Sequence, residues 1–265
     1  MKKLMFIFNP RSGKEQIRGQ LMGILDIFTK AGFDIHVHVT QSQKDCVEWV
    51  KDYAGRMDVL VVSGGDGTLN EAVTGMMNLE RLPLLGYIPA GSTNDFAASL
   101  GLPKSMQEAA ADFVEGSPYP IDIGRFCKDQ YFVYIAGFGA FTEVSYLTPQ
   151  DKKNWLGHNA YVLEGVKSLA GLKPRHMRVE WADQVLEEDF VFGMVTNTIS
   201  VGGFKGLVNQ SVALNDGEFE VLLIRMPRTP VDGVLDGEFG GSRTEVEIVN
   251  LQKKIRILRR NDELM

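Results

Sequence analysis

Three glycine-containing segments in the N-terminal part of this chain constrain its fold more than any other feature. They are Asn9-Pro10-Arg11-Ser12-Gly13-Lys14, Gly64-Gly65-Asp66-Gly67-Thr68 and Gly91-Ser92-Thr93-Asn94-Asp95-Phe96. Each follows a short apolar run and precedes a segment with helical spacing. Such strand-to-helix turns present unpaired N–H groups and the positive end of a helix dipole, which bind phosphate in open α/β sheets. Three of them in one domain predict a single nucleotide site assembled from all three.

Strand and helix patterns alternate along the first part of the chain and predict a doubly wound, mostly parallel α/β sheet. Apolar or alternating runs predict strands at residues 4–8, 33–40, 58–62 and 84–88. Helical spacing predicts helices at residues 15–31, 42–55, 69–77, 95–100 and 105–115. This order implies right-handed crossovers between parallel strands.

The pattern changes near Tyr119-Pro120, after which strand-like runs dominate. They lie at residues 131–136, 177–181, 190–197, 219–224, 245–249 and 255–258, with one long helix predicted at about 158–171. Alternating β-runs separated by turn residues are typical of an antiparallel sandwich or barrel. We therefore predict a nucleotide-binding α/β domain at residues 1–122 and an antiparallel β-sandwich domain at residues 123–265.

Composition and charge narrow the functional classes. The net charge of −6 argues against a nucleic-acid partner, although it leaves a local basic patch open. The two cysteines, Cys46 and Cys127, match no metal spacing and are interpreted as reduced thiols of a cytosolic protein. The apolar run that begins at Leu4 is too short for a signal peptide and stops at Asn9-Pro10, so we interpret it as a strand. No stretch is long enough to span a membrane, so any membrane contact is expected at the surface.

The second glycine segment combines backbone access with a carboxylate. Gly64, Gly65 and Gly67 let N–H groups approach an anion without a Cβ in the way. Asp66 repels phosphate directly, so its role there is to hold the loop or to reach Mg²⁺ through water. The alternative is a plain Asp-Gly turn, but residues 69–73 look helical, whereas a hairpin needs a second strand.

The first segment is not a P-loop, although Gly13-Lys14 resembles part of one. That motif needs a glycine five positions earlier, where Phe8 stands, and Ser or Thr after the lysine, where Glu15 stands. Asn9 and Lys14 are still candidates for phosphate contacts, with Lys14 acting as a point charge. The alternative for Lys14 is a solvated lysine at a helix start.

In the third segment, Ser92, Thr93 and Asn94 offer hydroxyl and amide groups at the start of a helix. Asp95 has two interpretations: it is a ligand of the site, or it only caps the helix.

Two acidic turns lie in the second part of the chain, at Asp216-Gly217-Glu218 and at Asp236-Gly237-Glu238. Carboxylates beside a glycine turn suit a hard cation or a general base. Taken separately, each is also compatible with a surface hairpin turn.

Together these residues resemble the diacylglycerol kinase catalytic-domain family, whose lipid kinases include sphingosine and ceramide kinases. The Gly-Gly-Asp-Gly-Thr string is shared with NAD kinases, and residues 91–96 and the two acidic turns make the match to the lipid kinases specific. The resemblance covers nearly the whole chain and implies ATP bound between the α/β domain and the β-sandwich. The positions that match its nucleotide site are Asn9, Lys14, Thr40, Gly64, Gly65, Asp66, Gly67, Thr68, Thr93 and Asn94.

The resemblance also assigns chemical roles. It implies that Glu238 is the general base for the lipid hydroxyl with Asp236 beside it, and that Asp66 acts on Mg²⁺ and phosphate. Asp216, with Glu218 and nearby carbonyls, matches a second, structural Mg²⁺ site. Asp95 and Asp122 match acidic residues that support the active site.

The expected acceptor is diacylglycerol, with phosphatidylglycerol or a sphingoid base as alternatives. An NAD kinase-like enzyme and a nucleotide-binding regulator without catalysis remain open. A lipid kinase is expected in the cytoplasm, transiently at the inner face of the membrane, and similar bacterial enzymes suggest a homodimer. Candidates for the membrane contact, which otherwise belong to ordinary solvated surface, are Lys152, Lys153, Trp155, Lys167 and the strand from Lys253 to Arg260.

One departure from the family pattern concerns the segment between Arg225 and Asp236, where only about ten residues intervene. Family members carry a longer, partly helical insertion there. Either this member is trimmed or residues have been lost, and an intact mass clearly above 29.4 kDa would establish the second case.

Overall fold

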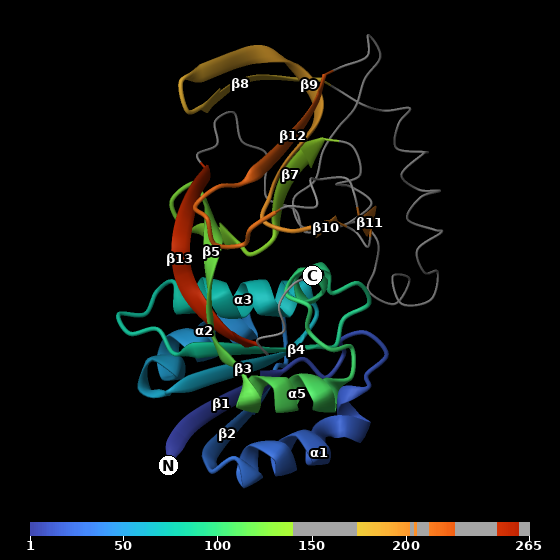
Figure 1. Cartoon of the computed structure of the whole chain (residues 1–265), viewed down its shortest axis with the longest axis vertical. Helices are drawn as coiled ribbons and strands as arrows, with labels where there is room; N and C mark the ends of the chain where they lie inside the picture. The colour runs from blue at the N-terminus through green and yellow to red at the C-terminus, as the bar shows by residue number, and fades with distance from the viewer. Residues whose placement is uncertain (140–173, 202–203, 206–211, 226–247, 260–265) are drawn as a thin grey trace. The chain divides into compact units, whose positions relative to one another are not determined.

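The computed structural model describes residues 1–139, 174–201, 204–205, 212–225 and 248–259. The chain forms two compact units (Figure 1). The first contains residues 1–133, 198–218 and 247–265, and the second contains residues 134–197 and 219–246. The chain therefore passes between the units four times.

The first unit is built on a seven-stranded mixed sheet with the order β2-β1-β3-β4-β13-β5-β6. Its strands are β1 (Lys2–Phe8), β2 (Phe33–Val39), β3 (Val59–Gly64), β4 (Leu84–Pro89), β5 (Ser117–Phe126), β6 (Gln130–Phe132) and β13 (Ile248–Arg259). Strands β2, β1, β3 and β4 are parallel, as predicted for a doubly wound sheet. Strand β3 is buried along its whole length, which explains its continuous apolar sequence.

Helices cover both faces of this sheet. They are α1 (Ile17–Lys30), α2 (Asp45–Tyr53), α3 (Asp66–Met76), α4 (Asp95–Ser99) and α5 (Met106–Glu115), with a short 3₁₀ helix η1 (Ala54–Arg56). Figure 1 shows α1 and α5 on one side of the sheet and α2 and α3 on the other. The core under α1 and α5 centres on Phe28, whose ring packs edge-on at 5.7 Å from Phe6 and 5.6 Å from Phe113. This packing joins α1 to β1 and to α5.

Strand β13 changes the predicted domain division. Residues 245–249 and 255–258 were expected as two strands of the second domain, but Ile248–Arg259 forms one strand with an irregular register between Leu251 and Ile255. It lies between β4 and β5, parallel to the first and antiparallel to the second. The two compact units are therefore interleaved, whereas the prediction used a single boundary at residue 122. Spacing along a sequence predicts a strand but does not say which strand will be its neighbour.

The described part of the second unit is one antiparallel sheet. Its strands are β7 (Ile135–Gly139), β8 (Arg175–Trp181), β9 (Gln184–Thr196) and β12 (Glu220–Arg225). They follow the order β12-β9-β7, with β8 also paired to β9. The antiparallel class predicted for this part of the chain is confirmed. The run predicted as one strand at 131–136 divides into β6 and β7, which belong to different units. The helix predicted near 158–171 lies outside the described residues.

Two short strands, β10 (Ser200–Val201) and β11 (Phe204–Lys205), pair as a separate hairpin. Within the residues that the structure describes, no helix is long and apolar enough to cross a membrane.

Candidate active site

The three glycine loops meet at one edge of the parallel sheet. They follow β1, β3 and β4, which are neighbours, so their C-terminal ends lie together. A Cβ added to Gly91 would come within 2.6 Å of the Gly65 Cα, and one added to Gly13 would clash with the carbonyl oxygen of Ala90. Gly13 also has a positive φ of 55°. Glycine is needed at these positions because the loops touch backbone against backbone.

Asp66 ties the second loop to the third. Its carboxylate accepts hydrogen bonds from the backbone N–H groups of Asp95, at 3.2 Å, and Phe96, at 3.3 Å. These are the first N–H groups of α4, so Asp66 caps that helix from a neighbouring loop. The sequence left Asp95 as either a ligand or the cap of this helix. In the structure the capping carboxylate is that of Asp66.

The position of Asp66 raises the pKa of its carboxyl group to about 6. Burial is the largest cause and the negative charge of Asp95 is the second, while the backbone N–H groups act in the opposite direction. Asp66 is therefore mostly ionised at neutral pH. Its negative charge is destabilised by burial and by Asp95, and a nearby cation would stabilise it.

Asp95 lies in a buried hydroxyl cluster that sequence reasoning did not find. Its side chain is only 2% exposed and accepts a hydrogen bond from the Ser200 hydroxyl at 2.6 Å. The Ser99 hydroxyl donates to the Asp95 carbonyl and lies 2.5 Å from the Thr198 hydroxyl. Ser200 and Thr198 are about a hundred positions from Asp95 in the sequence, and no spacing signal connects them.

Asn94 shapes the third loop with its side chain. Its Oδ1 accepts from the Gly91 N–H and its Nδ2 donates to the Gly91 carbonyl, both at 2.8 Å. The residue itself has a left-handed φ of 53°. Tyr87, which the sequence also did not identify, places its buried hydroxyl 3.4 Å from the same Oδ1. The Asn94 amide, predicted as a nucleotide ligand, thus already holds its own loop.

The first loop presents fewer fixed side chains. Asn9 Oδ1 accepts from the Arg11 N–H at 2.9 Å, and Asn9 Nδ2 donates to the Thr68 hydroxyl at 3.5 Å. Asn9 therefore bridges the first and second loops. Lys14 is exposed and makes no ion pair with any described residue, and Thr93 is also exposed. Both are available to a ligand.

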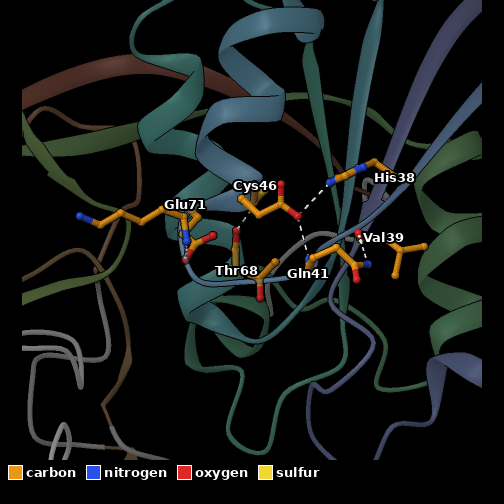
Figure 2. A network of polar contacts seen from close by, with 8 residues as sticks. His38, Val39, Gln41, Cys46, Thr68 and Glu71 are labelled. Carbon is orange, nitrogen blue, oxygen red and sulfur yellow. Dashed lines mark hydrogen bonds and ion pairs between the residues drawn. The ribbon is translucent and has the colours of Figure 1, made fainter.

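Thr40 follows β2 at the same edge of the sheet, and its N–H donates to the Phe8 carbonyl at 3.0 Å. The loop after it is fastened by the Asp45 carboxylate, which accepts from the Gln41 N–H at 2.7 Å and lies 3.1 Å from the His38 ring. Figure 2 shows this network reaching α3, where the carboxylate of Glu71 accepts from the Lys44 N–H at 2.9 Å. Residues 40–44 are thereby held beside the second glycine loop.

Cys46 takes part in the same network, because its thiol lies 3.9 Å from the Thr68 carbonyl (Figure 2). Burial raises the pKa of the Cys46 thiol well above its ordinary value, with Glu71 and Asp45 as smaller causes. Cys46 is a free cysteine, in line with its interpretation as a reduced thiol, and its burial makes the thiol unreactive.

Asp122 joins three separate segments of the first unit. Its fully buried carboxylate accepts from the Gly217 N–H at 2.7 Å and from the Lys253 N–H at 2.5 Å. The Asn250 amide also donates to it, at 3.5 Å. A supporting role for Asp122 was predicted, and the structure shows what it contacts: the predicted metal turn and the irregular part of β13.

The predicted metal ligands do not form one cluster. Asp216 and Glu218 are exposed in the turn, where the Asp216 carboxylate accepts from the Glu218 N–H at 3.0 Å. Over the described ranges, no group of three or more His, Cys, Asp or Glu side chains is arranged to hold a metal ion. Asp66 is therefore not gathered with Asp216 and Glu218 into a single centre.

Several predicted residues belong to segments that the structure does not describe. Asp236 and Glu238 lie outside the described residues, as do Lys152, Lys153, Trp155 and Lys167. Within β13, the side chains of Lys253, Lys254 and Arg256 are exposed.

Comparison with known proteins identifies the family. The model of the diacylglycerol kinase catalytic domain matches residues 3–126. A diacylglycerol kinase of Bacillus subtilis is 39% identical over 227 residues, which cover 85% of this chain and 74% of that protein. One of Staphylococcus saprophyticus is 35% identical over 224 residues, covering 84% of this chain and 73% of that protein. This chain belongs to the diacylglycerol kinase family.

A solved structure agrees with this assignment at the level of the fold. A putative diacylglycerol kinase from Bacillus anthracis superposes with a TM-score of 0.82 at 24% sequence identity, covering 98% of this chain and 96% of that one. The glycine loops, Asp66, Asp95 and Asp122 all lie within the residues matched by the diacylglycerol kinase catalytic-domain model.

Proposed function

We propose that this chain is an ATP-dependent lipid kinase that transfers the γ-phosphate of ATP to a lipid hydroxyl, with diacylglycerol as the acceptor and phosphatidic acid as the product. The observation that carries the proposal is the meeting of three glycine loops at the C-terminal edge of the parallel strands, in a member of the diacylglycerol kinase family. Phosphoryl transfer depends mainly on positioning and charge neutralisation, which such a cradle supplies.

In this proposal the backbone N–H groups of residues 65–68 and 92–93 receive the phosphates. Gly67 suits close approach, because a Cβ at that position would meet no protein atom within 4 Å. Lys14 supplies a positive charge that no described acidic residue neutralises. Thr40 and Thr68 line the same edge of the sheet, and Thr93 extends it from the exposed part of the third loop.

Mg²⁺ fits the chemistry at Asp66. The carboxylate stands at the start of α3, and its raised pKa reflects a negative charge that burial and Asp95 leave uncompensated. When bound, Mg²⁺ would neutralise charge on the phosphates. We place a second, structural Mg²⁺ at Asp216 and Glu218, whose turn Asp122 fixes through the Gly217 N–H. Carboxylate and carbonyl oxygens are the ligands that this ion prefers.

We assign the general base to Glu238, with Asp236 as its neighbour. A base at hydrogen-bond distance from the lipid hydroxyl removes its proton as the oxygen attacks phosphorus, a contribution of about 10²–10⁴-fold.

The acceptor determines where the enzyme works. A kinase for diacylglycerol works from the cytoplasm on the inner face of the membrane through a peripheral contact, without nucleic acid as a partner. Exposed Lys253, Lys254 and Arg256 on β13 are candidates for contacting anionic headgroups.

We also propose that the protein is a homodimer. Its molar mass in solution, measured by light scattering, tests this.

One experiment tests the function directly. The protein is incubated with Mg²⁺, γ-labelled ATP and a total lipid extract, and the labelled product is identified by mass spectrometry. Labelled phosphatidic acid is the expected result. Another labelled lipid would replace diacylglycerol as the acceptor but keep the reaction.

A parallel assay separates the alternatives. ADP release is measured with diacylglycerol micelles and with NAD. Release with NAD alone would indicate an NAD kinase-like enzyme. ATP binding without release on either acceptor would indicate a nucleotide-binding regulator.

A further inference from the structure

We propose that Tyr87 is a positioning residue of the nucleotide site, whose buried hydroxyl holds the second and third glycine loops in register. The inference rests on the function proposed above, because it treats these loops as the ATP cradle. Tyr87 would not touch the nucleotide. It would act through Gly64 and Asn94.

The hydroxyl of Tyr87 stands out in its strand. Strand β4 is otherwise apolar at its buried positions, and Tyr87 lies between Gly86 and Ile88 with only 2% of its surface exposed. A phenol at such a depth needs a hydrogen-bond partner for its hydroxyl. Tyr87 finds one in the Gly64 carbonyl, to which it donates at 3.2 Å, and it lies 3.4 Å from Asn94 Oδ1.

These two contacts reach different loops. Gly64 is the last residue of β3 and begins the second loop. Asn94 controls the third loop, because its amide binds both the N–H and the carbonyl of Gly91. Gly91 in turn packs against Gly65 so closely that a Cβ there would come within 2.6 Å of the Gly65 Cα. The Tyr87 hydroxyl therefore contacts one residue of each loop, Gly64 and Asn94.

The surrounding charges keep this hydroxyl a donor. Burial raises the pKa of Tyr87 well above its ordinary value, and the negative charges of Asp66 and Asp95 add to the effect. The phenol therefore keeps its proton at neutral pH.

Removing the hydroxyl should disturb the register and leave the fold intact. In Tyr87→Phe the Gly64 carbonyl would still accept from the Ala90 N–H at 2.8 Å, and Asn94 Oδ1 would still accept from the Gly91 N–H at 2.8 Å. Both acceptors of the Tyr87 hydroxyl therefore keep a hydrogen-bond donor in the variant. A net loss of one such hydrogen bond corresponds to a change in equilibrium constant of about 3- to 10-fold.

The experiment compares wild type and Tyr87→Phe by calorimetric titration with ATP in Mg²⁺ and by steady-state kinetics. We expect Kd and KM for ATP to rise about 3- to 10-fold while KM for the lipid is unchanged. The matched control is Tyr53→Phe. Tyr53 is 40% exposed on α2 and its hydroxyl bonds to no described residue, so its loss should change neither constant.

A double-mutant cycle tests the route through Asn94. Asn94→Gly removes the amide, and glycine accepts the positive φ of 53°. If Tyr87 acts through Asn94, Tyr87→Phe should weaken ATP binding less in the Asn94→Gly background than in wild type. Unchanged ATP affinity in Tyr87→Phe, or equal losses in both backgrounds, would overturn the inference.

The same titration separates this inference from the proposed function. Wild-type protein that binds ATP but phosphorylates no lipid would refute the kinase, yet the effect of Tyr87 on binding would still be measured. Wild-type protein that does not bind ATP would refute both.

Discussion

The carboxylate of Asp66 lies in a buried environment that destabilises its negative charge. It caps α4, but burial and the neighbouring Asp95 raise its pKa to about 6, above the ordinary value of 3.8. A folded-state pKa that is raised for an acid means that the folded protein binds the proton more tightly than the unfolded chain. This contribution to stability is complete below pH 3.8 and is lost as the pH rises through about 6.

We therefore predict that wild type gains stability relative to Asp66→Asn as the pH falls from 7.5 to 5. The measurement is thermal unfolding of both proteins in metal-free buffer, where no cation holds the carboxylate ionised. The difference in Tm between wild type and variant should be more favourable to wild type at the lower pH. A difference that does not change with pH would show that Asp66 titrates normally.

Lys14 gives a second prediction at this scale. It is exposed and unpaired among the described residues, so Lys14→Ala should leave Tm unchanged. If its ammonium contacts phosphate, Kd for ATP should rise at least about fivefold, and by less at high salt because of screening. Titration calorimetry at two salt concentrations measures this. Lys104→Ala, which removes another exposed lysine, is the control, and an equal effect there would contradict a specific contact.

Individual residues differ in how far their sequence context reveals them. Asp66 and Gly91 were predictable because each lies in a motif whose chemistry is local. The roles of Ser200 and Tyr87 were not predictable. A single hydroxyl in a strand leaves no periodic pattern in the sequence, and its hydrogen-bond partner is far away in the chain. The role of Asp66 as the cap of α4 was missed for the same reason, because Asp66 is close to that helix only in space.

At the scale of the elements, the contact between the second and third loops is the decisive feature. We predict that Gly91→Ala weakens ATP binding more than about tenfold, because the new Cβ would come within 2.7 Å of Asn94 Oδ1 and 2.6 Å of backbone in Gly65, so a loop must move. Equilibrium binding of a fluorescent ATP analogue measures this. The control is Gly19→Ala in α1, where a Cβ meets nothing and the helix should gain stability.

Asp122 links elements that are far apart in the chain. Asp122→Asn would turn an amide group toward the N–H groups of Gly217 and Lys253, which now donate to a carboxylate. We expect a loss of about 2–4 kcal/mol in the free energy of unfolding, measured by urea titration. Asp129→Asn, at an exposed position beside β6, should have little effect. A loss in Asp122→Asn no larger than in this control would show that the carboxylate is not a structural link.

The order of elements in the first part of the chain was predictable, since parallel strands buried on both faces and amphipathic helices have distinct patterns. Helix α3 begins at Asp66, three residues before its predicted start, because the loop glycines continue directly into its first turn. The path of β13 was not predictable, because its alternating sequence fits any half-buried strand.

At the scale of the whole molecule, the interleaved units predict that residues 1–122 do not fold alone. In that fragment β4 and the remaining part of β5 would lack β13, the strand that pairs with both. We expect no cooperative unfolding transition in urea, followed by circular dichroism, and recovery of one when residues 247–265 are fused to residues 1–133 by a flexible linker. A cooperative transition in the fragment 1–122 would contradict this view of the sheet.

Strand β13 also bears on biosynthesis. A ribosome delivers the chain from its N-terminus, so the strand that fills the middle of the first sheet is the last of the described strands to emerge. Until it does, the nascent protein has a gap between β4 and β5 and exposes two unpaired strand edges. The first sheet is therefore completed only after all the other described strands have emerged, and until then chaperones that shield strand edges can bind β4 and β5.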